Sequence, residues 1–355
     1  MKTWDVIVIG GGIVGLSLSR ELHKCGASVL VVERGEPGHE ASYAAGGMLA
    51  NCGDETPPAL QPLATASAEM YPEFAHEIED ESGEKVDLRS HGTLLFPSDR
   101  SGKEISGSLP LHAAVQELEP ALRTSGWTPA FLKERSVCPR ALVHAALKAA
   151  RHRGVDVSSG ARVTAVDVAE GRVIGVTTNK TSYRAATVVN CAGAWAGEIA
   201  LSPVPTRPVK GQMVCFAMPS RDLLRHVVRS PEIYLVPRSD GRLLAGATVE
   251  EAGYDKRTVP ETIQRLRRAA IAMLPALAQA RVLEDWAGLR PGTPDNLPIL
   301  GETAVPGYLV ATGHFRDGIL LAPVTARAMA QLIENGKSGY DLAPFSAERF
   351  ALRAA

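Results

Sequence analysis

The N-terminal segment sets the strongest limit on how this chain can fold. Residues 5–9 (DVIVI) form an apolar run rich in β-branched residues, which predicts a buried parallel strand. Gly10, Gly12 and Gly15 follow at once in GxGxxG spacing. The first glycine permits a tight turn, the second lets the backbone approach a pyrophosphate, and the third lets a helix pack on the strand. We expect that helix over about residues 12–24.

A second strand and an acidic residue complete this unit. Residues 28–32 (SVLVV) predict a strand that delivers Glu33 eighteen residues after Gly15. An acid at this place accepts hydrogen bonds from the ribose hydroxyls of an adenosine, and the phosphates lie at the N-terminus of the preceding helix. The order of strand, glycines, helix, strand and acid predicts dinucleotide binding; the alternative is a glycine-rich turn without a ligand. FAD and NAD share the adenosine half, so this unit does not choose between them.

Later segments carry further strand and glycine patterns. Residues 40–50 are small and glycine-rich and are typical of a loop, and residues 154–168 predict alternating strands. Residues 187–191 (TVVNC) predict a strand that runs into the glycine turn of residues 192–195. Residues 307–321 predict a strand, a glycine turn and the start of a helix.

These segments resemble the glycine oxidase branch of the D-amino-acid oxidase and sarcosine oxidase family of FAD-dependent oxidoreductases. The resemblance is closest over residues 313–323 (GHFRDGILLAP), extends over nearly the whole chain, and is interrupted mainly between residues 90 and 138. It implies a noncovalent FAD, because relatives that tether the flavin do so through a cysteine near the C-terminal motif and this chain has none after Cys215. The residues that the resemblance assigns to the cofactor are Gly10, Gly12, Ile13, Val14, Gly15, Glu33, Arg34, Ser42, Ala45, Gly46, Gly47, Met48, Val163, Ala192, Gly193, Trp195, His314, Arg316, Asp317, Gly318, Ile319 and Leu320.

The same resemblance points to three residues around a substrate. Arg290, in the segment 286–295 (WAGLRPGTPD), matches the arginine that holds the substrate carboxylate, and a guanidinium fork suits a carboxylate because it binds bidentately and stays charged. Tyr234 matches a tyrosine whose hydroxyl reaches the same carboxylate, and Arg316 is expected to line or brace the pocket beside the flavin. The alternatives are a surface arginine before a Pro-Gly turn and a tyrosine that only packs in the core.

One position departs from the family pattern. Two residues before the tyrosine, where a glycine oxidase relative carries histidine, this chain has Glu232. Its carboxylate could pair with a substrate ammonium, pair with Arg229, or face water. Substrate choice therefore stays open at this point.

The predicted fold class is α/β, α+β as a whole, with a Rossmann-like FAD-binding domain interleaved with a mixed-sheet substrate-binding domain. Strands of the second domain are expected at residues 92–97, 211–217, 233–237 and 242–247, with a hairpin turn at 239–241 and a helix over 260–274.

The chain is expected to leave the flavin domain and return to it. We assign residues 1–80, 136–205 and 287–355 to the FAD-binding domain, and residues 81–135 and 206–286 to the substrate-binding domain.

Composition removes several other classes of function. The net charge of −1, the pI near 6.8 and the lack of a Lys/Arg block argue against nucleic acid as a partner, and no segment reaches the ~20 apolar residues of a membrane span. Five cysteines, widely spaced and without a CxxC pair, are expected to be reduced thiols in a cytoplasmic protein. No HExxH or paired His/Cys pattern predicts a metal site. Assembly as a homo-oligomer is left open.

The resemblance implies oxidative deamination of glycine, sarcosine or a small D-amino acid. A hydride passes from Cα to flavin N5, molecular oxygen is the expected acceptor, and the products are an imine or 2-oxo acid, ammonia and hydrogen peroxide. In glycine oxidases the imine can serve thiamine biosynthesis. The alternatives are a D-amino-acid dehydrogenase, a sarcosine oxidase-like demethylating enzyme, and an NAD-dependent or non-catalytic dinucleotide-binding protein.

Overall fold

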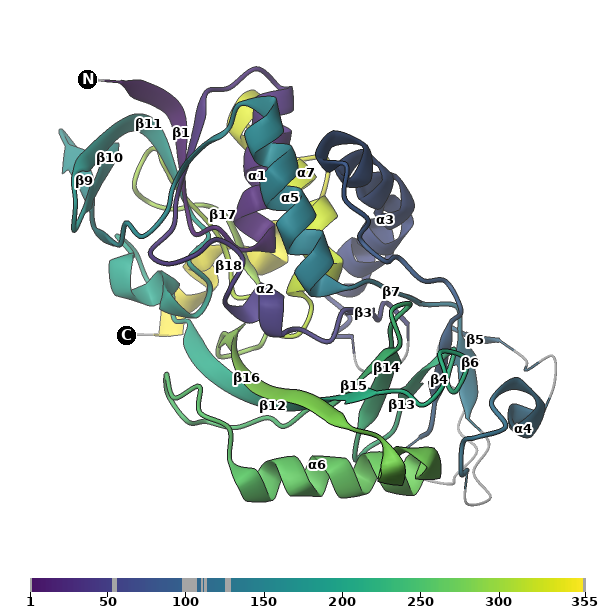
Figure 1. The fold of residues 1–355 in the computed structure, drawn as a ribbon. Helices are drawn as coiled ribbons and strands as arrows, with labels where there is room; N and C mark the ends of the chain where they lie inside the picture. Colours follow the sequence, from purple (N-terminus) through teal and green to yellow (C-terminus); the bar gives the residue numbers. More distant parts are fainter. Residues whose placement is uncertain are drawn as a thin grey trace.

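The computed structural model describes residues 2–52, 56–97, 107–109, 111, 114–124 and 129–353, with side chains described to residue 350. Figure 1 shows two sheets, each with its own helices, joined along one side. Residues 1, 53–55, 98–106, 110, 112–113, 125–128 and 354–355, which the two predicted domains include, lie outside the described residues.

The first sheet is built around the N-terminal strand. Strand β1 (Thr3–Ile9) pairs in parallel with β2 (Val29–Val32) on one side and with β11 (Ser182–Asn190) on the other. The strand order is β17-β18-β11-β1-β2-β8, and a hairpin of β9 and β10 joins the edge of β11. The other bounds are β8 (Asp156–Ser158), β9 (Val163–Ala169), β10 (Arg172–Thr178), β17 (Ile299–Glu302) and β18 (Tyr308–Thr312). The expected parallel strand at residues 5–9 is confirmed.

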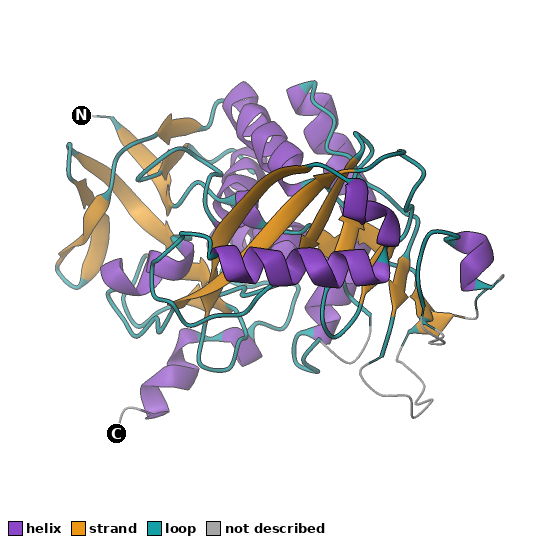
Figure 2. Ribbon diagram, turned by 60° about the horizontal axis from the view of Figure 1, so that its bottom comes forward, coloured by secondary structure: helices purple, strands orange, loops and turns teal. Residues whose placement is uncertain are grey.

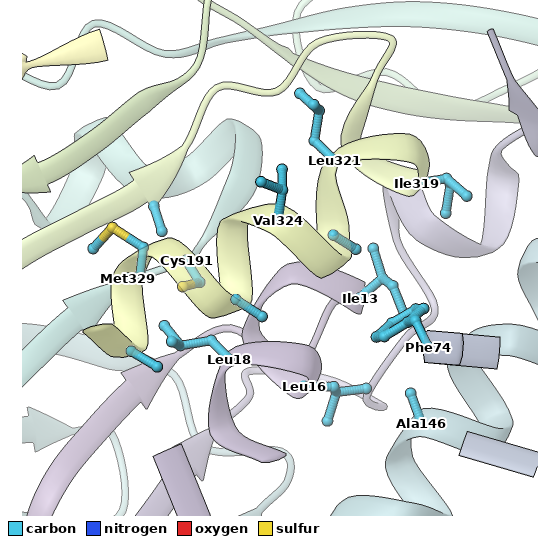
Figure 3. Packing of buried hydrophobic residues seen from close by; sticks show 14 of the residues in the cluster. Ile13, Leu16, Leu18, Phe74, Ala146, Cys191, Ile319, Leu321, Val324 and Met329 are labelled. Carbon is cyan, nitrogen blue, oxygen red and sulfur yellow. The ribbon is translucent and has the colours of Figure 1, made fainter. Parts of the chain in front are cut away.

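The two faces of this sheet are covered by different layers. Val6 and Val8 of β1 point into a core shared with four helices, whereas Ile7 and Ile9 point to the β9–β10 hairpin side, because successive strand residues alternate. Figure 3 shows the helix side, where Leu18 lies near Met329, and Leu16 lies near Phe74 and Ala146. The four helices are α1 (Ile13–Lys24), α3 (Gln61–Ser82), α5 (Pro139–Arg153) and α7 (Gly318–Asn335).

The second sheet is mixed, as predicted. Its strand order is β16-β12-β15-β14-β13-β4-β6-β5, with β13 parallel to β4 and the other pairs antiparallel. The bounds are β4 (Thr93–Leu95), β5 (Ser108–Leu109), β6 (Ala130–Leu132), β12 (Arg207–Ala217), β13 (Val227–Arg229), β14 (Tyr234–Pro237), β15 (Arg242–Gly246) and β16 (Val282–Gly292). Helix α6 (Pro260–Met273) lies across its outer face (Figure 2).

Short elements connect the two halves. The segment at residues 40–50, expected as a loop, contains α2 (Ala41–Ala44) and β3 (Met48–Leu49). The remaining elements are α4 (Val115–Leu118), β7 (Arg135–Ser136), and 3-10 turns at Gly193–Ile199, Pro275–Gln279, Ala343–Phe345 and Ala347–Arg353.

The chain visits each sheet more than once. It runs from the first sheet to β4–β6, returns for β8–β11, crosses again for β12–β16, and returns for β17 and β18. The α/β fold with interleaved parts is therefore confirmed. The domain bounds remain a prediction, and β16 spans the proposed boundary at residue 287. Within the described ranges, no helix combines the length and apolar character that crossing a bilayer requires.

Candidate functional site

A cavity of about 730 Å³ lies between the two sheets. Ile9, Val32, Cys191 and Thr312 line it, so it opens at the carboxyl ends of β1, β2, β11 and β18. Open α/β sheets bind their ligands at this edge. The opposite wall comes from β12, β14 and β16 of the mixed sheet.

The turn after β1 has no room for side chains. Gly10 has a φ of +107°, and a Cβ on it would lie 2.5 Å from the carbonyl oxygen of Cys191. A Cβ on Gly15 would overlap the carbonyl oxygen of Gly10, so helix α1 can pack on this turn only with glycine there. Gly10 lines the cavity, whereas Gly15 packs against the turn and does not line it.

Glu33 is held in one orientation at the end of β2. Its Oε2 accepts the N–H of Gly11 at 2.8 Å and its Oε1 accepts the N–H of Gly35 at 2.8 Å. The side chain is 9% exposed and lines the cavity. A carboxylate fixed in this way still offers lone pairs to the hydroxyl groups of a ribose.

An aromatic stack stands next to Glu33. The guanidinium carbon of Arg34 lies 3.4 Å from the ring centroid of Trp195, and the Trp195 ring stacks on Tyr254 at 5.3 Å with an interplanar angle of 22°. Arg34 and Trp195 were predicted from the sequence, whereas Tyr254, which comes from the loop after β15, was not. Lys256 of the same loop donates to Glu40 at 3.0 Å, so this loop ties the two halves together close to Arg34, which also binds Glu40.

Two helix N-termini face the cavity. At the start of α1 the Ile13 N–H donates to the Ser42 hydroxyl at 3.0 Å, and at the start of α7 Asp317 and Gly318 line the cavity. Helix N-termini favour negative charge, so they suit a pyrophosphate and an electron-rich ring. Beside α7, burial lowers the pKa of His314 to about 4, so its imidazole is neutral at pH 7.

The structure brings the predicted cofactor residues together. Two of them do not line the cavity: Gly15, which packs against the turn, and Leu320, which is 1% exposed and lies in the helix core. Those that line it are Gly10, Gly12, Ile13, Val14, Glu33, Arg34, Ser42, Ala45, Gly46, Gly47, Met48, Val163, Ala192, Gly193, Trp195, His314, Arg316, Asp317, Gly318 and Ile319. The tight glycine turn, the fixed acid and the paired helix N-termini fit a dinucleotide with a flavin ring.

Arg290 lies on strand β16 and faces the cavity, so it is not a surface arginine before a turn. Its Nη1 donates to the carbonyls of Thr248 at 3.0 Å and Lys210 at 3.3 Å. The guanidinium lies directly over Gly211 of the neighbouring strand, where any Cβ would overlap it. Burial lowers the pKa of Arg290, although Tyr234 opposes this effect.

Tyr234 and Arg316 line the same cavity as Arg290. The Tyr234 hydroxyl donates to the Met213 sulfur at 3.6 Å. Burial raises the pKa of Tyr234, while Arg290 and Arg316 act in the opposite direction, so the hydroxyl stays protonated at neutral pH. Arg316 follows Phe315, a residue with a φ of 46°, and its guanidinium carbon lies 5.4 Å from the Phe315 ring centroid.

Glu232 and Arg229 have different surroundings. Glu232 is exposed and lines the cavity. Arg229 is 5% exposed and donates to the buried carboxylate of Glu134 at 3.0 Å. Glu134 also accepts the Cys52 N–H at 3.2 Å, which links the cavity wall to β6 and β13. No pattern in the sequence pointed to Glu134, because its partner is 95 residues away.

The five cysteines are free thiols. Two of them, Cys52 and Cys191, line the cavity. Burial raises the pKa of both thiols, which makes them poor nucleophiles at neutral pH. Among the described residues, no group of three or more His, Cys, Asp or Glu side chains is arranged to hold a metal ion.

Comparison with known proteins identifies the family. The family model "FAD dependent oxidoreductase" (DAO) matches residues 5–332. Glycine oxidase of Pseudomonas aeruginosa is 32% identical over 96% of this chain and 98% of its own length. The bifunctional protein ThiO/ThiG of Trichormus variabilis is 36% identical over 99% of this chain; the chain spans 56% of that relative, about half of its length. The crystal structure of glycine oxidase from Geobacillus kaustophilus superimposes with a TM-score of 0.91 at 30% identity, covering 98% of this chain and 99% of that one. The chain therefore belongs to the DAO family of FAD-dependent oxidoreductases.

Proposed function

We propose that this chain oxidises a small amino acid at its amine-bearing carbon, with glycine as the first candidate substrate. The observation that carries the proposal is the state of Arg290. Its guanidinium donates to two backbone carbonyls and forms no ion pair within the described part of the chain, yet it faces the cavity. A charge in this position needs an anionic partner, and the substrate carboxylate supplies one.

The other side chains position the rest of the substrate. The Tyr234 hydroxyl, protonated at neutral pH, can donate a second hydrogen bond to the carboxylate that Arg290 holds. Arg316 adds positive charge to the same wall, and Met213 with Met48 keeps part of it apolar. Together they fix the carboxylate at one end, which directs the Cα–H bond toward the cofactor side of the cavity.

FAD supplies the redox chemistry when bound, since it takes up a hydride, two electrons and one proton, from the substrate carbon. The nitrogen also gives up a proton, so the amino acid becomes an imino acid, which water hydrolyses to a 2-oxo acid and ammonia. We propose molecular oxygen as the acceptor, reduced by two electrons and two protons to hydrogen peroxide. Relatives named glycine oxidase and ThiO/ThiG support glycine and a place in thiamine biosynthesis.

Two further features belong to this proposal. The free thiols support a location in the reducing cytoplasm. Assembly into a homo-oligomer remains a prediction, which size-exclusion chromatography with light scattering tests directly.

The test is peroxide release by the purified protein in air, with glycine, sarcosine, D-alanine and D-proline offered separately. Arg290→Ala should keep the yellow flavin and lose at least about 10²-fold in kcat/KM, because the carboxylate clamp is gone while the cofactor cradle remains. Arg281→Ala, an exposed arginine just before the same strand, is the matched control and should behave as wild type.

The outcomes separate the alternatives. Peroxide with one of these amines supports an oxidase. A protein that none of them turns over in air, but whose flavin one of them bleaches without oxygen, is a dehydrogenase with another acceptor. Unchanged turnover in Arg290→Ala would show that the carboxylate binds elsewhere.

A further inference from the structure

Arg238 carries a buried charge that the proposed reaction does not use. It directly follows strand β14 and is 1% exposed. Its Nη2 donates to the carbonyl oxygen of Gly46 at 2.5 Å, and its Nε and Nη1 have no hydrogen-bond partner among the described residues. The nearby carboxylate of Asp87 is bound to the hydroxyl and N–H of Ser239 instead.

Such a group costs stability. A buried guanidinium without a carboxylate partner pays a desolvation penalty, and one hydrogen bond to a carbonyl offsets only part of it. Burial also lowers the pKa of Arg238, the direction expected for a charge in an apolar setting. Arg238 is therefore not explained by its contribution to stability. Its role depends on the segment that it contacts.

That segment is the Gly46–Gly47 wall of the cavity. Both glycines line the cavity, whereas Arg238 lies behind them and does not. The carbonyl of Gly46 points back to Arg238, and the carbonyl of Gly47 accepts the Val137 N–H at 2.8 Å. Both carbonyls are thus turned away from the cavity toward protein donors.

The direction of one carbonyl determines the direction of the next N–H. The peptide between Gly46 and Gly47 is trans, and in a trans peptide the C=O and N–H bonds point to opposite sides. The N–H of Gly47 therefore points away from Arg238 and to the cavity side. It has no acceptor within the described part of the chain, so it is a donor that awaits a ligand.

The position of this donor identifies which part of the cofactor it meets. A Cβ on Gly46 would lie 3.2 Å from the Tyr234 ring, so this wall borders the substrate end of the cavity. Glu33 and the Arg34–Trp195 stack mark the adenosine end. A donor at the substrate end faces the flavin ring rather than the adenosine.

We propose that Arg238 is a positioning residue for the flavin: it holds the Gly46 carbonyl from behind and so directs the Gly47 N–H toward a hydrogen-bond acceptor on the flavin ring. This inference rests on the flavin site of the proposed function. If Arg238 has this role, its loss changes the rate of flavin reduction and leaves substrate binding unchanged.

The test compares Arg238→Met with two other variants in the flavin-loaded protein. Methionine fills similar space without a donor or a charge, and Arg238→Lys keeps a charge and one donor. Arg242→Met is the matched control, because Arg242 pairs with Asp240 and does not touch Gly46. The readouts are the visible flavin spectrum, the anaerobic rate of flavin reduction, KM, and hydrogen exchange of the amides of residues 45–48.

We expect Arg238→Met to shift the flavin absorption bands and to slow flavin reduction roughly tenfold, the loss expected for one hydrogen bond. KM should stay within about twofold, and the amides of residues 45–48 should exchange faster. Arg238→Lys should recover most of the rate, and Arg242→Met should match wild type. An Arg238→Met protein with the wild-type spectrum, rate and exchange, changed only in thermal stability, overturns the proposal.

Two safeguards keep the result decisive. If Arg238→Met does not fold, wild-type protein carries the test: the amides of residues 45–48 must exchange at least about tenfold slower with FAD than without it, and equal exchange overturns the proposal. If the wild-type protein binds FAD but oxidises no amine, the proposed substrate is wrong, while spectrum and exchange still test Arg238.

Discussion

Because Arg290 lies tightly against Gly211, a substitution at Gly211 can displace the guanidinium that we propose binds the substrate carboxylate, without changing Arg290 itself. In Gly211→Ala, the new methyl carbon would lie about 1 Å closer to both Nη atoms of Arg290 than the 3.4 Å of ordinary contact. Gly211 does not have a left-handed backbone, so alanine adds no torsional strain there. The guanidinium is the movable partner, so it must shift by about 1 Å and weaken its bonds to the Lys210 and Thr248 carbonyls.

The size of the effect follows from this shift. A displacement of about 1 Å in a group that orients substrate costs on the order of 10²-fold in rate, or about 2.7 kcal/mol of transition-state stabilisation. Weakening two hydrogen bonds costs roughly 1–2 kcal/mol of folding stability, so the protein should fold and keep its flavin. We therefore expect kcat/KM for the amino-acid substrate to fall about 10²-fold with an unchanged visible spectrum.

The assay is steady-state peroxide release together with anaerobic flavin reduction, each measured against substrate concentration. Gly339→Ala is the matched control, since Gly339 also lacks a left-handed backbone and meets only the end of the Gln331 side chain, far from the cavity. A Gly211→Ala enzyme with kcat/KM within twofold of wild type would refute the reasoning, because it would mean that the position of Arg290 does not matter.

Three further predictions concern the cofactor and stability. Gly15→Ala should lose its flavin and about 2 kcal/mol of stability, because the methyl group overlaps the Gly10 carbonyl; full flavin occupancy in the purified variant would contradict this. The pKa of His314 is lowered by burial to about 4, below its usual 6.5, so the unfolded chain takes up the proton first. The stability that the neutral imidazole contributes is complete above about pH 6.5 and is lost as pH falls toward 4, by up to about 1.4 kcal/mol per pH unit. Urea unfolding at pH 7.5 and at pH 5 should show this loss in the wild-type protein and a smaller loss in His314→Asn. Equal losses in the two proteins would argue against this role of His314. Acid precipitation should release all yellow colour into the supernatant, since no thiol of the cavity is activated, whereas colour retained in the pellet would mean a covalent flavin.

What the sequence could predict was local or carried by the family resemblance. The spacing of Gly10, Gly12 and Gly15 specifies a turn by sterics alone, and the apolar run before it specifies a buried strand, so the first sheet could be anticipated. The positions of Arg290 and Tyr234 followed from the resemblance, and the structure places both on one cavity wall.

What the sequence could not predict depends on contacts between distant segments. Tyr254 stacks on Trp195 only because the loop after β15 folds back over the first domain. Arg238 looks like an ordinary charged residue after a strand, and only tertiary packing buries it behind Gly46. Neither the Tyr254–Trp195 stack nor the Arg238–Gly46 hydrogen bond is reflected in a periodic or regularly spaced sequence pattern, so neither contact could be predicted from one segment alone.

The interleaved path of the chain has a consequence for synthesis. The glycine turn at residues 10–15 leaves the ribosome long before β18 (Tyr308–Thr312) and α7 (Gly318–Asn335), which complete its sheet and supply the second helix N-terminus of the site. Until those residues emerge, the early strands have an exposed edge and an uncovered apolar face. The nascent chain therefore depends on protection until those residues emerge, and a premature stop before residue 308 removes β18 and α7, which leaves the cofactor site incomplete.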